Sequence, residues 1–240
     1  MHEPIVLFEA SGVLAVAKPP GLATQAPPGC ASVESWARSR TTAPGAYVGM
    51  PHRLDRAVSG VVLVALSPRA ARKLSRQFER RQVRKTYRAV VAVAAPPDIL
   101  DACQATRDER AEWHDLVEKV PDEPRARIAT DPDAAGVREA VTLARWLGPV
   151  PDAPDRGLVE LEPLTGRMHQ LRLQAATRGM PIVGDTLYGG PAAQLGSAVA
   201  SDPRTRPIAL HAWKIAWFDP DGGQPMEAEA PLPAWWPGTR

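Results

Sequence analysis

A strand–helix–strand pattern in the first half of the chain constrains the fold more than any other feature. Six consecutive apolar residues, 61–66, have the length of a buried strand rather than of a helix. Ser67-Pro68 follows, and it combines an N-cap side chain with proline at the first helical position. The next apolar residues recur every three or four positions and predict a helix with one buried face; they are Ala71, Leu74 and Phe78. A second strand is expected over 86–93.

Directly ahead of the first of these strands, the segment 52–60 places one carboxylate between two arginines. The carboxylate belongs to Asp55, and the arginines are Arg53 and Arg56. Nearby positive charge favours the ionised form of a carboxylic acid, and Ser59-Gly60 lets the backbone turn sharply into the strand. Two interpretations fit this segment: an anionic catalytic group on a loop held by a buried strand, or a surface salt bridge that closes a turn.

Further elements are expected on both sides of this unit. The sequence predicts a hairpin over 5–17, a helix over 32–40 capped by Ser32, and a helix over 168–177 ended by Gly179. Short antiparallel strands are expected between 94 and 157, the best of them at 140–144, and another strand at 158–161. A final strand pair is expected within 208–218, and 231–240 is interpreted as a flexible tail. One domain over residues 1–240 is expected.

The composition is that of an ordinary globular protein, with 44% hydrophobic and 23% charged residues among 240. No apolar run approaches the ~20 residues of a membrane helix, and no signal peptide precedes the first expected strand. Cys30 and Cys103 lie far apart and match no metal or disulfide spacing. A reduced, cytoplasmic setting without a membrane is therefore expected.

The formal net charge of +2 does not by itself argue for a nucleic-acid partner, but its distribution is informative. Residues 69–88 contain nine Lys or Arg against one acid, Glu79, whereas residues 98–160 contain fifteen acids against eight bases. Because the basic segment directly follows the Asp55 loop, it predicts contact with phosphate groups. A solvated helix face is the alternative.

Four ordered motifs resemble those of the RluA-type pseudouridine synthases. They are Lys18-Pro19-Pro20-Gly21, His52-Arg53-Leu54-Asp55, Lys85-Thr86-Tyr87, and a long segment that runs from Thr165-Gly166-Arg167-Met168-His169-Gln170-Leu171-Arg172 to Gly184-Asp185-Thr186-Leu187-Tyr188-Gly189. The resemblance covers residues 5–211. It implies an α+β fold with a mixed, largely antiparallel central sheet, flanking helices and a central RNA-binding cleft. It also implies isomerisation of a specific uridine to pseudouridine in structured RNA, such as an rRNA or tRNA stem-loop.

The resemblance further implies a catalytic set. Asp55 matches the catalytic aspartate, which either attacks C1′, adds to C6 of the base, or removes the ribose 2′-proton to give a glycal, the route that the chemistry of the family favours. Arg172 is expected to form the ion pair that orients Asp55, because a desolvated carboxylate must be paired. Tyr87 offers a ring on which a flipped uracil can stack and a hydroxyl that can assist loss of the C5 proton.

Five more residues are expected to bind the substrate. Arg53 matches the residue that fills the gap left by the flipped base, and His52 is expected to support the loop through hydrogen bonds. Lys85 and Arg167 are candidate contacts to phosphate or to the loop, and Leu164 is a candidate for the wall of the uracil pocket. The reaction implies no cofactor and no metal, and we expect a monomer. The first strand begins so early that we expect no N-terminal RNA-binding domain of the kind that some relatives carry.

Two positions depart from the family pattern. Val58 stands where threonine is usual, so a hydroxyl that would steady the loop is missing. Gln174 stands where histidine is common. Neither belongs to the catalytic set, so the departures bear on local geometry, and Val58 is expected to loosen the loop and lower the rate.

Other functions remain open at this point. A metal-dependent nuclease would need His52, Asp55, His169, Asp185 and His211 as ligands, but the chain lacks short-range ligand spacing. A glycoside hydrolase would need two acids flanking the scissile bond, and Asp185 is interpreted as a turn residue. A catalytically impaired RNA-binding homologue would have no physical reason to keep a buried charge pair.

Overall fold

The structure, a computed structural model, describes residues 3–41, 45–93, 110–151, 153–195 and 205–236. It contains two compact units, of which the first comprises Met1–Lys85, Gly196–Pro207 and His211–Trp235. The second comprises Thr86–Leu195, Ile208–Leu210 and Trp236–Arg240. The single domain expected over 1–240 therefore stays a prediction. Within the expected tail, Trp236 is buried, and residues 237–240 lie outside the described part.

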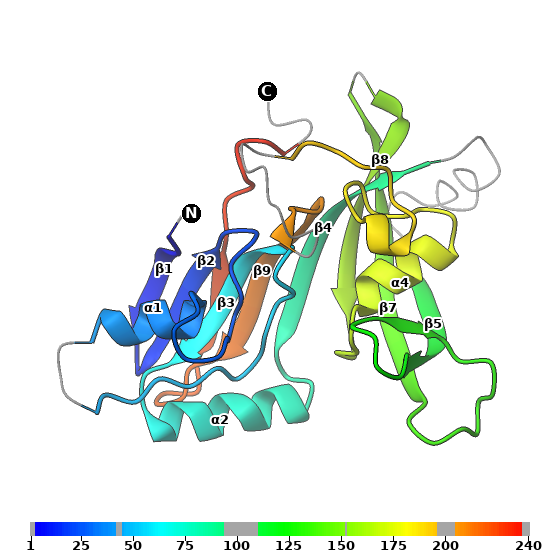
Figure 1. Cartoon of the computed structure of the whole chain (residues 1–240). Coiled ribbons are helices and arrows are strands. Elements are labelled where there is room, and N and C mark those ends of the chain that lie inside the picture. Colours follow the sequence, from blue (N-terminus) through cyan, green and yellow to red (C-terminus); the bar gives the residue numbers. More distant parts are fainter. Residues whose placement is uncertain (1–2, 42–44, 94–109, 152, 196–204, 237–240) are drawn as a thin grey trace. The chain divides into compact units, whose positions relative to one another are not determined.

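The first unit is built on a mixed sheet. Its elements are β1 (Ile5–Ala10), β2 (Val13–Lys18), α1 (Val33–Ser39), β3 (Ser59–Ala65), α2 (Pro68–Glu79), β9 (Leu210–Phe218) and β10 (Pro225–Glu229) (Figure 1). The first residue of β9, Leu210, is counted in the second unit. Strands β1, β2 and β3 pair antiparallel, β3 pairs parallel with β9, and β10 pairs antiparallel with β9. The expected hairpin over 5–17 is confirmed as β1 and β2.

The core of this unit forms around β3. All seven residues of β3 are buried, which explains why its sequence is a continuous apolar run instead of an alternating one. Helix α2 begins as expected, since the Ser67 hydroxyl accepts a hydrogen bond from the backbone N–H of Ala70 at 3.1 Å. Leu74 is fully buried, and Gln77 exchanges two 2.8 Å hydrogen bonds with the backbone of Phe218. The helix is thus fixed to the sheet by apolar and polar contacts.

The start of β3 requires glycine. Gly60 adopts a φ of 117°, and a Cβ built on it would lie 2.2 Å from the carbonyl oxygen of Ala212 on β9. A side chain at position 60 would therefore separate β3 from β9, where Ser59 and Gly60 pair with His211 and Ala212. The sequence placed a sharp turn at Ser59-Gly60, but both residues already belong to β3, and the turn lies at Arg56-Ala57.

The described residues of the second unit form an antiparallel sheet and one α-helix. Its elements are β4 (Arg84–Ala92), β5 (Ala111–Lys119), β6 (Ala126–Ile128), β7 (Arg138–Val150), β8 (Ala153–Pro163), α4 (Gln170–Thr177) and the 3-10 turn η1 (Thr186–Tyr188), with the first two residues of β4 counted in the first unit. The strand order is β4, β8, β7, β5, β6, and every pair is antiparallel. Together with the first unit, this confirms the expected mixed, largely antiparallel α+β fold.

Three expectations about secondary structure were wrong. Strands β7 and β8 are 13 and 11 residues long, whereas short strands were expected. The expectation failed because the register of the pair shifts near Gly148, which interrupts the apolar alternation along a single long strand. The segment 208–218 contains one strand, β9, whose hairpin partner β10 lies farther along the chain. Helix α4 begins at Gln170 rather than at Met168, because His169 adopts a left-handed conformation with a φ of 51°. Residues 94–109 of the expected strand-rich region lie outside the described part.

None of the helices in the described ranges has both the length and the apolar character needed to cross a bilayer.

Candidate active site

The loop that carries Asp55 is fastened by a threonine hydroxyl. Thr24 is buried, and its Oγ1 donates to the carbonyl oxygen of Leu54 and accepts from the N–H of Leu54, both at 3.0 Å. After Asp55, the chain turns back through a 3.1 Å hydrogen bond from the N–H of Val58 to the carbonyl oxygen of Asp55. The backbone on both sides of the carboxylate is therefore fixed by hydrogen bonds that do not involve the carboxylate.

A buried lysine also holds the Asp55 loop through hydrogen bonds to backbone carbonyl groups. Lys18, the last residue of β2, is 1% exposed, and its Nζ donates to the carbonyl oxygens of Pro19, Leu22 and Arg56 at 3.1, 2.8 and 3.3 Å. The carbonyl of Arg56 also accepts the N–H of Gly21 at 2.7 Å. Three donors of one ammonium group thus have three acceptors, which is how a buried charge is tolerated. These bonds tie the Lys18–Gly21 motif to the residue directly after Asp55.

The Lys18 ammonium is also electrostatically coupled to the site. Burial lowers the pKa of Lys18 from its usual range to about 7, while the negative charge of Asp55 raises it and the charge of Arg56 lowers it. The sequence assigned the positive partners of Asp55 to Arg53 and Arg56, but both are exposed. The buried cation within reach of Asp55 in this unit is Lys18.

His52 supports the loop, as expected from the sequence. Its Nε2 accepts the N–H of Leu63 on β3 at 2.9 Å, and its ring stacks on Phe78 of α2 with centroids 4.7 Å apart. Burial, together with the smaller effect of the nearby Lys85 ammonium, lowers the pKa of His52 to about 3. The imidazole is therefore neutral at physiological pH, with its proton on Nδ1, and it connects β3, α2 and the loop.

The remaining predicted site residues of the first unit are Arg53 and Lys85. Arg53 is exposed, as a residue that reaches into a substrate must be. Lys85 is half-buried, and burial lowers its pKa. The first unit thus brings together His52, Asp55 and Lys85, and adds Lys18 to them.

In the second unit, Arg172 forms a two-pronged ion pair with Asp185. The Nε and Nη2 atoms of Arg172 donate to Oδ2 and Oδ1 of Asp185 at 2.7 and 2.8 Å, and the two side chains are 9% and 2% exposed. Asp185 is a turn residue, as the sequence predicted, since its N–H donates to the carbonyl oxygen of Ile182; its carboxylate is in addition the buried ion-pair partner of Arg172. The expected pairing of Arg172 with Asp55 joins residues of different units and stays a prediction.

An aromatic ring covers the face of the same guanidinium. The Arg172 guanidinium carbon lies 5.2 Å from the ring centroid of Tyr188 on η1. The Tyr188 hydroxyl accepts the N–H of Ala126 on β6 at 2.9 Å and shares a 3.0 Å hydrogen bond with Nδ1 of His169. Arg172 therefore lies among residues from α4, η1 and β6.

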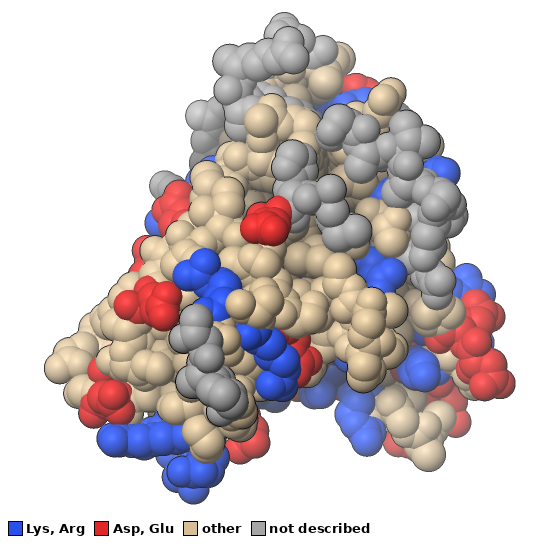
Figure 2. Space-filling model, turned by 60° about the vertical axis from the view of Figure 1, so that its left-hand side comes forward, with Lys and Arg blue, Asp and Glu red and all other residues tan. Residues whose placement is uncertain are grey.

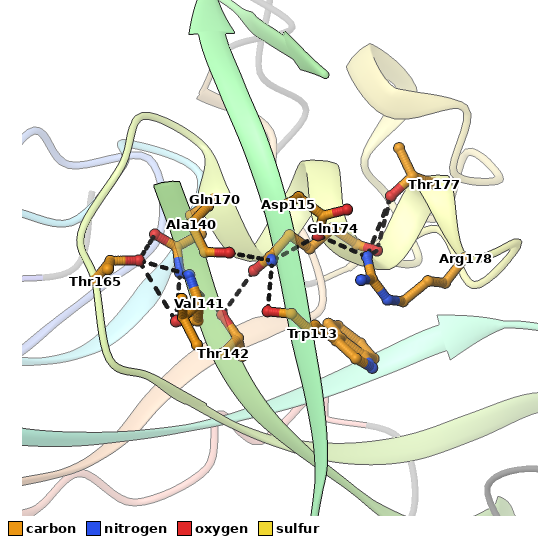
Figure 3. Close-up of polar contacts among 10 residues, drawn as sticks. All are labelled: Trp113, Asp115, Ala140, Val141, Thr142, Thr165, Gln170, Gln174, Thr177 and Arg178. Atoms are coloured by element: carbon orange, nitrogen blue, oxygen red, sulfur yellow. Dashed lines mark hydrogen bonds and ion pairs between the residues drawn. The ribbon is translucent and has the colours of Figure 1, made fainter. Parts of the chain in front are cut away.

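Helix α4 is anchored by a buried chain of side-chain hydrogen bonds (Figure 3). Gln170 donates to the Thr142 hydroxyl at 2.9 Å, and Thr142 donates to Oε1 of Gln174 at 2.6 Å. Nε2 of Gln174 then donates to Asp115 at 2.7 Å and lies 3.1 Å from the carbonyl oxygens of Trp113 and Ala140. Glutamine at position 174 thus has a donor and an acceptor, both satisfied, in a fully buried place.

Replacing Gln174 by leucine is expected to lower the free energy of unfolding by about 2–4 kcal/mol, because Thr142 and Asp115 lose their shared partner. Urea denaturation measures this change. Thr177→Val, which removes a hydrogen bond to the backbone of Gln174 and a long one from Arg178 at the end of the same helix, serves as the control and should lower the free energy by less than about 1 kcal/mol. Equal losses in the two variants would contradict a special role for the buried chain.

The other predicted residues of the second unit occupy the strands and the loop before α4. Tyr87 is half-buried on β4 and pairs with Leu161 on β8. Leu164, just beyond β8, is 38% exposed, and Arg167 donates through Nε to the carbonyl oxygen of Glu139 at 2.8 Å. Tyr87, Leu164, Arg167 and Arg172 are thus all carried by β4, β8 and the segment that follows β8.

The side chains proposed as nuclease ligands have protein partners of their own. His211 lies between the Ser59 hydroxyl, 2.8 Å from Nδ1, and the carbonyl oxygen of Ala230, 3.2 Å from Nε2. His52, His169 and Asp185 bind Leu63, Tyr188 and Arg172 as described above. Within the described ranges, no three His, Cys, Asp or Glu residues form a group suited to hold a metal ion.

Sequence reasoning missed Lys18, Thr24, Asp185 and Tyr188. A signal for Lys18 was present, because it ends a strand whose other residues are all apolar, and a charge at such a position needs several partners. Asp185 and Tyr188 are three residues apart on one turn, so both can reach the same side chain. Nothing local in the sequence distinguishes Thr24 from other loop threonines.

Several known proteins are similar to this chain in sequence or in structure. A family model described as RNA pseudouridylate synthase matches residues 12–177. The tRNA pseudouridine synthase C of Salmonella typhimurium is 35% identical over 193 residues, which are 80% of this chain and 71% of that protein. The dual-specificity RNA pseudouridine synthase RluA of Yersinia pestis is 33% identical over 227 residues, which are 92% of this chain and 96% of that protein. The solved structure of human RNA pseudouridylate synthase domain containing 1 matches with a TM-score of 0.70 at 23% identity, covering 98% of this chain and 88% of that one, and it supports the fold.

Proposed function

Because this chain belongs to the RNA pseudouridylate synthase family and is thus a pseudouridine synthase, we propose that Asp55 is its catalytic residue and that its substrate is a specific uridine in a tRNA or rRNA stem-loop. The observation that carries the assignment of Asp55 is its loop. Thr24, Lys18 and His52 hold the Asp55 loop and the strand that follows it by hydrogen bonds of their own. A loop fixed in this way keeps its side chain in one position, as a reacting group requires.

The reaction needs one well-placed anion. The N1–C1′ bond of uridine breaks, the uracil turns, and a C5–C1′ bond forms; the C5 proton then leaves and N1 ends with a proton, so the product is an isomer. We propose that the Asp55 carboxylate assists cleavage of the N1–C1′ bond, as a nucleophile or as the base that removes the 2′-proton. The buried Lys18 is electrostatically coupled to this carboxylate, since the negative charge of Asp55 raises the pKa of Lys18.

The other site residues have proposed roles that follow from their exposure. Arg53 is exposed at the start of the loop, where it can occupy the space that an extruded base leaves in the RNA stack. Tyr87 offers its ring to the uracil and its hydroxyl to the C5 proton. Arg172 is proposed to pair with the catalytic carboxylate, and Leu164 is proposed to contact the base.

We propose that the basic segment from α2 to the start of β4 contacts the RNA backbone. On the face drawn in Figure 2, Lys and Arg side chains lie among acidic ones and form no continuous basic surface. We therefore expect phosphate groups to bind at a local cluster of arginines and not evenly over the surface. Arg76, Arg80 and Arg84 are exposed, and α2 also lines a groove with the exposed ring of Tyr47 beside Arg72 and Arg76. An aromatic ring next to guanidinium groups is suited to a nucleotide.

Reversing the charge at Arg76, Arg80 and Arg84 to glutamate is expected to weaken RNA binding at least 10-fold at low salt. It is also expected to flatten the plot of log affinity against log salt, because each lost phosphate contact removes about 0.7–0.9 from the slope. Filter binding across a salt series measures both quantities.

The matched control reverses Arg38, Arg125 and Arg127, whose charges are already balanced by Glu34, Glu123 and Glu118. The control changes net charge by the same amount and is expected to leave the slope close to that of the wild type. If the two triple variants bind with equal affinity and equal slope, the α2 segment is not the RNA-binding face.

The proposed function is tested by tritium release from RNA transcripts that contain 5-tritiated uridine, with tRNA and rRNA substrates compared. Release of tritium without chain cleavage is the expected result. Binding without release indicates a catalytically impaired RNA-binding homologue, whereas chain cleavage that a chelator abolishes indicates a nuclease. Mapping of pseudouridine in total RNA with and without the gene then identifies the target uridine.

A further inference from the structure

We propose that Asp185 is a positioning residue for Arg172, and that the rate of the reaction depends on it even though it touches no substrate. The inference rests on the proposed function, because Arg172 is proposed there to act at the reacting uridine. It assigns a reaction-related role to Asp185, which the sequence analysis interpreted only as a turn residue.

The geometry of the pair determines which way the guanidinium faces. An arginine side chain carries five N–H donors in one plane. Asp185 accepts one from Nε and one from Nη2, at 2.7 and 2.8 Å, which fixes the plane of the group and its rotation within that plane. The three other N–H groups of Arg172, one on Nη2 and two on Nη1, lie along the two remaining edges of the guanidinium. Asp185 thus selects the edges that Arg172 presents to other partners.

Tyr188 gives the guanidinium a second contact. The guanidinium carbon of Arg172 lies over the Tyr188 ring, 5.2 Å from its centroid. The ring itself is held through its hydroxyl by Ala126 and His169. Arg172 is therefore restrained at one edge by Asp185 and by the ring of Tyr188 before any RNA binds, and a residue restrained in this way is preorganised.

Asp185→Asn is the most direct test of this role. Asparagine has the same shape, but it offers one acceptor and one NH2 donor, and the donor opposes an N–H of Arg172. We expect kcat to fall at least 10-fold, with KM for the RNA within about 2-fold of the wild type, because misplacement of a reacting group affects the transition state more than binding. Single-turnover tritium release and steady-state kinetics measure the two constants.

Asp115→Asn is the matched control. Asp115 pairs with Arg178, the residue that follows α4, at 2.9 Å, so the change removes the same kind of charge from a pair at the other end of that helix. It is expected to leave kcat within about 2-fold of the wild type. If both variants lower kcat equally, Asp185 acts only by holding the helix, and the proposal is wrong.

A second background separates positioning from general support. Lysine at position 172 keeps the charge but cannot form the two-pronged pair. In Arg172→Lys protein, Asp185→Asn is therefore expected to lower kcat by less than about 2-fold further, since the orientation is already lost. A 10-fold loss in both backgrounds contradicts the proposal. If Asp185→Asn does not fold, Asp185→Glu replaces it in the same cycle, and unchanged kcat in that variant is equally contradictory.

The controls also separate this inference from the proposed function. If the wild-type protein releases no tritium from any RNA tested, the proposed function fails. If the wild-type protein is active and Asp55→Asn is not, but Asp185→Asn keeps kcat, only the role of Asp185 fails.

Discussion

Asp55→Asn is expected to lower the rate of pseudouridine formation at least about 10³-fold while RNA affinity stays within about 3-fold of the wild type. Asparagine keeps the size of the side chain, and the loop is held by Thr24, Lys18 and His52, whose contacts to the backbone do not depend on the carboxylate. The change therefore removes the anion from an otherwise intact site. Single-turnover tritium release and filter binding measure the two quantities.

Asp221→Asn is the control for this variant. Asp221 lies in the same unit, is exposed, and pairs with Arg69 of α2 at 3.3 Å, so the substitution removes the same charge from a residue outside the catalytic set. It is expected to leave the rate unchanged. Retention of more than a tenth of wild-type activity by Asp55→Asn would rule out Asp55 as the catalytic carboxylate.

Lys18→Met is expected to change how stability depends on pH. The pKa of Lys18 is about 7 in the folded protein, below its usual 10.5, because burial disfavours the charged form. The unfolded chain therefore binds the proton more tightly between pH 7 and pH 10.5. In that window the contribution of Lys18 to the free energy of unfolding rises with pH, by up to about 1.4 kcal/mol per pH unit, and below pH 7 it stays at its lowest value.

The measurement is urea denaturation of the wild type and of Lys18→Met at several pH values from 6 to 10. The free energy of unfolding of the wild type minus that of the variant should be flat below about pH 7 and rise above it. Lys214→Met is the control, because Lys214 is exposed and Glu229 raises its pKa, so its difference curve should stay flat in this window. A flat curve for Lys18 would mean that its hydrogen bonds fully offset the effect of burial.

The same variant should be a poor enzyme. Without the ammonium group, the carbonyl oxygen of Arg56 loses one of its two donors, and the carbonyls of Pro19 and Leu22 lose a partner. We expect the rate to fall about 10-fold or more, since the loop next to Asp55 is less well fixed. The loss should be smaller than that of Asp55→Asn, because the carboxylate is still present.

The structure shows the surroundings of Val58 and Gln174, the two residues that depart from the family pattern. Val58 lacks the hydroxyl that is usual there, but the loop has other fastenings, in Thr24, Lys18 and His52. The expected loosening of the loop by Val58 remains untested. Gln174, the other departure, lies in a chain of satisfied hydrogen bonds beneath α4, so its residue type follows from the partners around it.

Local pattern alone determined a large part of this protein. Continuous apolar sequence predicted the buried strand β3, and Ser67-Pro68 with the apolar stripe predicted α2. The ordered motifs predicted the family, the α+β sheet and the reaction. These features are readable because each depends on residues close together in the sequence, where secondary-structure periodicity and capping operate.

Only the tertiary structure decided which side chains are the partners of the charged site residues. Sequence placed Arg53 and Arg56 beside Asp55 because they are neighbours along the chain, yet a buried cation coupled to it is Lys18, from the end of β2. Sequence also left Asp185 as a turn residue, whereas packing brings it onto Arg172. A charge in the interior is stabilised by whichever groups the fold packs around it, and their identity follows from contacts between distant segments and not from spacing along the chain.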